Sequence, residues 1–165
     1  MQPIDCEYPP NTLEDYLRQS YFACRCDLGG SGVDPYTLGE LREVASLGTE
    51  VLDAIPFLDS DSYAGTPLRA ALAQRFMNGD ESRVMATHGS SEALYLVQKV
   101  LAPRGSRVVA VSPSYQQLHS VVQQSGCEMV PWSLRAADRF VPDLDEFERL
   151  MKPGAQLVIA NFPHN

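Results

Sequence analysis

Apolar residues recur every three or four positions in two segments of the first half of the chain, as one face of an amphipathic helix requires. They are Leu38, Leu41, Val44 and Leu47 in the first segment and Leu68, Leu72 and Phe76 in the second. This spacing predicts helices over 37–47 and 67–79. A shorter helix is predicted over 12–21, inside a stretch rich in Pro, Gly and acidic residues that indicates an N-terminal arm over 1–36.

The pattern changes after Gly79, where short runs rich in β-branched residues alternate with helical segments. We predict strands over 84–87, 107–111, 128–132 and 156–162, and helices over 91–101, 114–124 and 143–152. Strands that alternate with helices of about ten residues form β-α-β units. The predicted fold class is therefore α/β, a three-layer α/β/α arrangement with a mostly parallel sheet.

Two details refine this expectation. The runs RVVAV (107–111) and LVIA (157–160) are apolar without alternation, so both strands should be covered on both faces. Asp143, followed three residues later by Glu146, is a capping-box signature for the helix over 143–152.

Composition and charge narrow the range of partners. The chain has 165 residues and a net charge of -8, and Lys99 and Lys152 are its only lysines. Nucleic-acid binding depends on clustered Lys and Arg, so no nucleic-acid partner is expected. No basic and apolar leader opens the sequence, and no run approaches the length of a membrane span. We therefore expect a soluble cytoplasmic protein without a membrane partner.

The four cysteines are expected to be free thiols, because their spacing does not suit a small disulfide scaffold and no secretion signal precedes them. A zinc site built from Cys24, Cys26, Cys127 and one histidine is an alternative. It is disfavoured because C-x-C is not the usual C-x-x-C clip.

Candidate chemistry gathers where predicted strands end, because ligands of open parallel sheets bind outside the carboxyl ends of the strands. The first strand runs into a turn at Gly89, and the backbone N–H groups of Ser90 and Ser91 open the next helix. Backbone donors at a helix N-terminus favour a phosphate. The simpler alternative is that Ser90 or Ser91 only caps the helix.

Two further polar residues follow predicted strands. Tyr115 opens the helix after the second strand, so its ring could lie over a planar group attached to the phosphate. Its alternative role is a tyrosine packed at a strand end with the hydroxyl in water. Asn165 follows the last strand and could donate to a ring oxygen, although asparagine is also common in turns.

Taken together, THGSSEAL (87–94), APRGSRVVAVSPSYQQL (102–118) and NFPHN (161–165) resemble the first half of the fold-type I, pyridoxal-phosphate (PLP) dependent aminotransferases of class I and II. The resemblance covers roughly 37–165. It includes TPLRAALAQRF (66–76), which is similar to the family's G-x-x-x-L-R-x-A-I-A segment. It implies that 37–165 is part of the PLP-transferase large domain, truncated at the family's N-P-x-G turn, and that PLP is the cofactor.

The resemblance also implies roles for individual residues. The backbone of Gly89 and Ser90, with Ser91, would hold the cofactor phosphate. Tyr115 matches the residue that stacks on the pyridine ring. Asn165 matches the asparagine that begins the N-P-x-G turn and hydrogen-bonds the cofactor's phenolic oxygen.

Other positions match less uniformly. Gly32 and Val33 fall where family members pass backbone close to the substrate carboxylate. The family usually has a glycine where this chain has Ala64, and Tyr63 is a poor match to the tyrosine that reaches the partner subunit's phosphate. LEDYLRQSYF, SGVDPYTLGELR, THGSSEALYL and NFPHN also resemble the capreomycidine synthase branch of the family, PLP enzymes that cyclise a hydroxylated arginine.

The lysine that forms a Schiff base with PLP has no counterpart here. Lys99 lies nine residues past Ser90, about 13 Å along the helix at ~1.5 Å per residue, and Lys152 ends a helix at the opposite edge of the sheet. We therefore predict no catalytic residue in this chain. The implied activity is amino acid transamination or cyclisation, with a homodimer or a complementing C-terminal chain. The alternative is a non-catalytic binding or assembly module of the same fold.

Other site classes fit less well. A Rossmann-type site at Gly29, Gly30 and Gly32 would have to follow a strand, which these glycines do not. A hydrolase elbow needs the second glycine of G-x-S-x-G, which THGSS lacks. His119 falls within a helix, as a surface or packing residue would.

Overall fold

The structure is a computed structural model that describes residues 12–20, 23, 25–26 and 32–163. The chain divides into two compact units. One comprises Met1–Cys26 and His88–Asn165, and the other comprises Asp27–Thr87. We call them the sheet unit and the helical unit.

The sheet unit is built on three parallel strands in the order β2-β1-β3. These are β1 (Arg107–Ser112), β2 (Glu128–Ser133) and β3 (Leu157–Ile159). The central strand pairs Val109 with Val130 on one side and with Val158 on the other. A parallel sheet is the predicted outcome of strands joined by helical crossovers.

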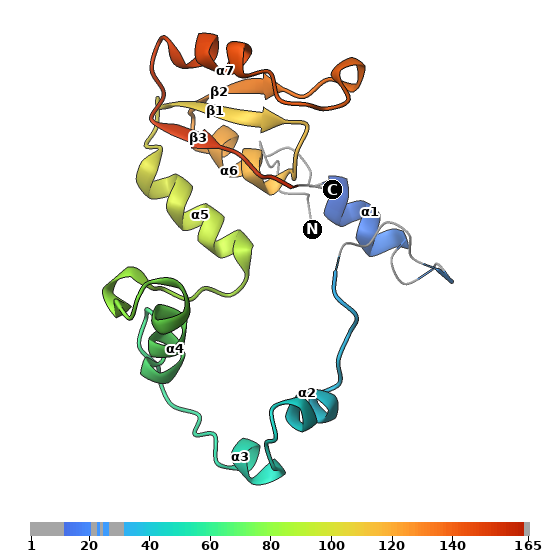
Figure 1. The fold of residues 1–165 in the computed structure, drawn as a ribbon, viewed down its shortest axis with the longest axis vertical. Coiled ribbons are helices and arrows are strands. Elements are labelled where there is room, and N and C mark those ends of the chain that lie inside the picture. The colour runs from blue at the N-terminus through green and yellow to red at the C-terminus, as the bar shows by residue number, and fades with distance from the viewer. Residues whose placement is uncertain (1–11, 21–22, 24, 27–31, 164–165) are drawn as a thin grey trace, which may run out of the picture. The chain divides into compact units, whose positions relative to one another are not determined.

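Helices cover both faces of this sheet, as Figure 1 shows. They are α5 (Ser90–Leu101), α6 (Gln117–Gln124) and α7 (Leu144–Met151), while α1 (Thr12–Ser20) belongs to the same unit. Val108 and Ala110 face a core shared with α5 and α6, and Val109 and Val111 face a second core shared with α7. The predicted three-layer α/β/α fold class is confirmed.

The two strands expected to be covered on both faces differ. All four residues from Val108 to Val111 are buried, so the expectation holds for β1. It is wrong for β3, where Val158 is 38% exposed. The register places Val158 beside Val109, on the α7 face, but α7 packs against β2 and leaves this part of β3 uncovered.

The helical unit contains α2 (Leu38–Val44), α3 (Thr49–Asp53), α4 (Thr66–Phe76) and a 3-10 turn, η1 (Glu81–Arg83). The two helices predicted over 37–47 and 67–79 are present as α2 and α4, although each ends three residues earlier than predicted. Thr37 and Glu40 form a full capping box, since the Thr37 hydroxyl accepts from the Glu40 N–H and the Glu40 carboxylate accepts from the Thr37 N–H. In the described part of this unit Ala73 is the one buried residue.

The predicted strand over 84–87 is wrong. Val84 has extended backbone, but no strand pairs with this segment in the described chain. Two backbone hydrogen bonds hold it, from the Val84 N–H to the Glu81 carbonyl at 3.2 Å and from the Ala86 N–H to the Tyr63 carbonyl at 2.9 Å. A strand exists only as part of a ladder, and an apolar run alone does not supply the partner.

One helix start and one helix cap also differ from expectation. The helix predicted over 114–124 begins at Gln117, so Tyr115 lies in the turn before it, with its carbonyl accepting from the Leu118 N–H. The Asp143 half of the predicted capping box is present, since its carboxylate accepts from the Glu146 N–H. The Glu146 carboxylate instead binds Arg135 at 2.6 and 3.1 Å.

Candidate functional site

The turn into α5 offers backbone donors to a ligand. Gly89 has a φ of +84°, a left-handed conformation that favours glycine, and a Cβ at this position would meet no atom within 4 Å. Ser90 and Ser91 are the first two helical residues, both exposed, and no side chain caps the helix. The alternative in which one of these serines serves only as the N-cap is therefore wrong. The first amides of α5 open towards solvent, as an anion site requires.

Glu92 holds this turn from inside the helix. Its carboxylate accepts from the His88 backbone N–H at 2.6 Å and lies 3.4 Å from the His88 ring. A carboxylate in the first helical turn is stabilised by the helix dipole. Glu92 thus fixes the chain on the N-terminal side of Gly89.

Ser91 joins this turn to the turn that carries Tyr115. Its hydroxyl donates to the side-chain carbonyl of Gln117, the first residue of α6 and two positions after Tyr115. The Tyr115 ring is half-buried and packs against the core beneath α5 and α6. The helix start and the aromatic ring, 24 residues apart in sequence, therefore meet in one place.

Residues of α1 complete the surroundings of Tyr115. The Tyr115 hydroxyl donates to Glu14 at 3.4 Å, and the Gln116 side chain accepts from the Thr12 N–H and hydroxyl at 3.1 and 3.2 Å. Burial, and then the charge and hydrogen bond of Glu14, raise the pKa of Tyr115 above its ordinary value, while the Ser91 hydroxyl lowers it. The phenol therefore keeps its proton at neutral pH.

These residues fit a phosphorylated aromatic group. Exposed amides and two seryl hydroxyls suit the phosphate, and the Tyr115 ring lies beside them. One adjustment is needed, because the Ser91 hydroxyl already donates to Gln117 and must turn to donate to a phosphate.

The remaining predicted residues do not belong to the described part of the sheet unit. Asn165 lies outside the described residues. Gly32 and Val33 belong to the helical unit, where Val33 is 90% exposed, and their predicted contact with the substrate carboxylate stays a prediction.

Neither lysine approaches the site. Lys99 lies in the last turn of α5, at the other end from Ser90, with its ammonium 5.5 Å from the Tyr95 ring centroid. Lys152 ends α7 ahead of β3, at the amino end of the sheet. The positions predicted for both lysines are confirmed.

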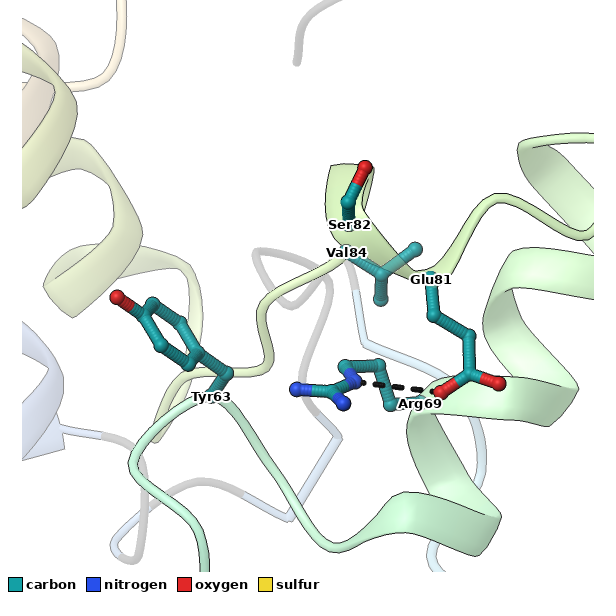
Figure 2. A pocket seen from close by; sticks show the side chains of 5 residues that line it. All are labelled: Tyr63, Arg69, Glu81, Ser82 and Val84. Atoms are coloured by element: carbon teal, nitrogen blue, oxygen red, sulfur yellow. Dashed lines mark hydrogen bonds and ion pairs between the residues drawn. The ribbon is translucent and has the colours of Figure 1, made fainter.

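The helical unit holds a separate hollow of about 310 Å³. It is lined by Tyr63, Arg69, Glu81, Ser82 and Val84. Figure 2 shows the Arg69 guanidinium between Tyr63 and Glu81, with Nε 3.4 Å from the Glu81 carboxylate. A second carboxylate, that of Asp61, lies 3.9 Å from Nη1 of Arg69. These two acidic partners offset the positive charge of Arg69, so this hollow is a poorer candidate for an anion site.

No set of three His, Cys, Asp or Glu side chains in the described part of the chain could hold a metal ion. Cys24, one of the ligands of the zinc alternative, lies outside that part, and Cys127 donates to the Ala102 carbonyl at 3.3 Å. None of the described helices combines the length and the apolar run needed to cross a membrane.

Sequence analysis missed Glu14 and Gln117, the side chains that touch Tyr115 and Ser91. Glu14 lies 101 residues from Tyr115, and no local pattern links the two. Gln117 had a weak signal, because the residues that open the helix after a strand face the same edge as the strand end.

Known proteins resemble this chain both in sequence and in fold. The family model for aminotransferase class I and II matches residues 37–165. Capreomycidine synthase of Streptomyces vinaceus is 44% identical over 159 residues, which cover 95% of this chain and 41% of that protein. The methionine aminotransferase of Escherichia coli K12 is 32% identical over 104 residues, or 59% of this chain and 27% of that enzyme.

A solved structure extends the comparison to three dimensions. The PLP-dependent cyclase OrfR superposes with a TM-score of 0.86 and 36% identity, covering 100% of this chain and 43% of that one. This chain thus spans less than half the length of these relatives. The family model and the cyclase structure indicate pyridoxal phosphate as the cofactor. The chain belongs to the class I and II aminotransferase family.

Proposed function

We propose that this chain supplies the phosphate-binding and ring-binding part of a PLP site in an enzyme that acts on an amino acid. One observation carries the proposal: Ser91, at the open start of α5, donates to the α6 residue Gln117, which lies two positions after Tyr115. A phosphate and an aromatic ring joined in one small molecule would satisfy both turns together.

Each residue has a defined task in this proposal. Gly89 gives the backbone its left-handed turn, and the amides of Ser90 and Ser91, with their hydroxyls, bind the phosphate. Tyr115 stacks on the ring and, because its pKa is raised, remains a neutral phenol. Asn165 would donate to the ring's phenolic oxygen, as the family resemblance implies.

When bound, PLP supplies an electron-withdrawing ring that stabilises negative charge at the α-carbon of an amino acid. The residues of this chain orient that ring and shield one of its faces from water. Holding the ring in a fixed plane restricts which bond of the substrate lies perpendicular to it, so Tyr115 contributes through orientation.

The lysine, and with it proton transfer at the substrate, must come from outside the residues described above, since Lys99 and Lys152 both lie away from the site. We propose that a homodimer or a complementing chain completes the enzyme. Transamination and cyclisation are both open to it. The 44% sequence identity with capreomycidine synthase and the superposition on a PLP-dependent cyclase favour cyclisation. A cytoplasmic location is part of the same proposal.

A second candidate is a binding or assembly module that keeps the fold without the chemistry. The distance of both lysines from the site favours it. The two candidates differ in one result. Supplied with a lysine-bearing second chain, half of an enzyme should consume an amino acid, whereas a module should bind the cofactor without turnover.

Cofactor binding is tested by titrating the purified chain with PLP and with pyridoxamine phosphate, followed by calorimetry and induced circular dichroism. We expect saturable binding at one site. Tyr115→Ala should weaken it about 2- to 10-fold, the worth of one aromatic stacking contact. Gly89→Val should weaken the binding of both cofactor forms and of inorganic phosphate, because valine resists a φ of +84°.

Tyr95→Ala is the matched control, because Tyr95 lies on the exposed surface of α5 beside Lys99. Tyr95→Ala should leave the affinities for PLP and for pyridoxamine phosphate unchanged. The proposal fails if the unmodified chain shows no saturable binding, or if Tyr95→Ala weakens binding as much as Tyr115→Ala does.

A further inference from the structure

His119 makes two hydrogen bonds directly behind the Tyr115 turn. It lies in the first turn of α6 and is half-buried. Its ring Nε2 is 2.8 Å from the Val111 carbonyl oxygen and 2.9 Å from the Ser114 hydroxyl. A carbonyl can only accept, so Nε2 carries the hydrogen, and this one N–H is shared between the Val111 carbonyl and the Ser114 hydroxyl, which both accept. The ring therefore connects α6 to the end of β1 and to the residue next to Tyr115.

The Val111 carbonyl needs such a donor. Along β1, the Arg107 carbonyl accepts from Gln156 on the β3 side and the Ser112 carbonyl accepts from Leu134 on the β2 side. Carbonyls alternate along a strand, so that of Val111 points to the β3 side. There β3 pairs with β1 only as far as Ala110, opposite Ile159. The β1–β3 ladder offers no backbone donor to the Val111 carbonyl, so the His119 N–H takes that place. Val111 is fully buried, where an unpaired carbonyl would be costly.

The second bond of His119 acts on the turn itself. Ser114 precedes Tyr115, whose carbonyl accepts from the Leu118 N–H as α6 begins. The four residues from Ser112 to Tyr115 are thus held at the strand end, at Ser114 and at the helix start. The hydrogen bond between Tyr115 and Glu14 involves the tip of the tyrosine, its hydroxyl. His119 instead binds the strand end and the residue before Tyr115, next to the backbone from which the ring projects.

We propose that His119 is a positioning residue that sets the plane of the Tyr115 ring, and through it the plane of the stacked cofactor. The inference rests on the proposed function. It assigns His119 no contact with substrate or cofactor, because the recorded bonds of its ring run to the protein's own strand and turn.

The test compares His119→Leu, which removes the donor, with His119→Gln, whose side-chain amide can still donate to Val111. Gln123→Leu, an exposed residue of the same helix, is the control. Two quantities are measured on the full chain. One is amide hydrogen exchange over residues 112–118 without any ligand, and the other is the affinity for pyridoxamine phosphate and for inorganic phosphate.

We expect His119→Leu to accelerate exchange over 112–118 about tenfold and to weaken pyridoxamine phosphate binding about 3- to 10-fold, the effect of one lost buried hydrogen bond. Inorganic phosphate affinity should stay unchanged, because the α5 turn is untouched. His119→Gln should come close to the unmodified chain, both in amide exchange over 112–118 and in pyridoxamine phosphate affinity. If His119→Leu does not fold, Ser114→Ala, which removes one of the two acceptors, should give a smaller change of the same kind.

Three results would overturn the proposal. Exchange over 112–118 could stay as in the unmodified chain, His119→Gln could behave like His119→Leu, or phosphate affinity could fall as far as pyridoxamine phosphate affinity. Failure of the proposed function looks different. In that case the unmodified chain binds no pyridoxamine phosphate, while the exchange measurement still decides whether His119 fixes the turn.

Discussion

The two units of this chain bury their apolar residues to very different extents. In the sheet unit, four consecutive residues of β1 are buried, and Trp132, Leu134 and Ile159 surround them. In the helical unit, Ala73 is the one buried residue among those described, and most apolar positions of α2 and α3 are exposed. Both units contain segments with apolar residues at helical spacing, so an apolar pattern and burial are separate properties.

The difference shows where a precise site can be built. Side chains hold a fixed geometry when their element is packed against a core, and the α5 and α6 turns both rest on the core of the sheet unit. The hollow of the helical unit is fixed instead by Arg69 and its two carboxylates, partly exposed ion pairs that contribute little to stability. The candidate site accordingly lies in the sheet unit.

The largest test of this contrast is a pair of identical substitutions. Leu134→Ala, at a residue 5% exposed in the sheet unit, should lower the free energy of unfolding by about 2–4 kcal/mol, because it leaves a cavity. Leu41→Ala, at a residue 49% exposed on α2, should cost less than about 1 kcal/mol. Urea titration followed by far-UV circular dichroism measures both. Equal losses would mean that the helical unit is packed as tightly as the sheet unit.

A smaller effect of opposite sign is expected at Gln98. This α5 residue is 3% exposed, its side-chain nitrogen donates to the Leu118 carbonyl at 3.4 Å, and its side-chain oxygen has no hydrogen-bond partner. An unsatisfied buried acceptor is costly, so Gln98→Leu should stabilise the sheet unit by about 1 kcal/mol. Gln123→Leu, at an exposed position, should have almost no effect in the same urea titration. A destabilised Gln98→Leu would show that the bond to Leu118 outweighs the unpaired oxygen.

The smallest effect concerns pH. Hydrogen bonds from Arg135 hold the pKa of Glu146 below its ordinary value of 4.5. A carboxyl group with a lowered pKa in the folded state stabilises that state above the unfolded pKa, and the contribution disappears as the pH falls through the folded pKa. Glu146→Gln should therefore lower the melting temperature at pH 7 but not at the acid end of a titration below pH 4.5.

Glu148→Gln, an exposed residue on the same helix, is the control and should leave the melting temperature unchanged at every pH. A Glu146→Gln deficit that persists undiminished at low pH would exclude the ion pair as its cause.

Sequence analysis predicted the elements whose signals are local. The apolar run of β1 and the helical spacing of α5 and α7 each lie within a dozen residues, and their positions are correct to within a few residues. The run over 84–87 looked equally strand-like, but strand formation depends on a partner that its own residues do not specify. Thr37 and Glu40 had a readable capping signature that the prediction did not use.

The candidate site divides along the same line. The glycine turn followed by two serines is a local signature, and it correctly predicted an open helix start at Ser90. The contacts of Tyr115 with Glu14 and of Ser91 with Gln117 join residues 101 and 26 positions apart, so they depend on how the elements pack. His119 is the same case, since its role follows from where β3 stops pairing with β1.

The central claim is that the α5 turn and the Tyr115 turn bind the two ends of one molecule. Nuclear magnetic resonance of the isotope-labelled chain during titration with pyridoxamine phosphate tests this directly. The amides of Gly89, Ser90, Ser91 and Tyr115 should shift along a single saturation curve, while inorganic phosphate should shift only the first three. The claim is contradicted if the Tyr115 amide does not respond, or if it saturates at a different concentration from the amides of the α5 turn.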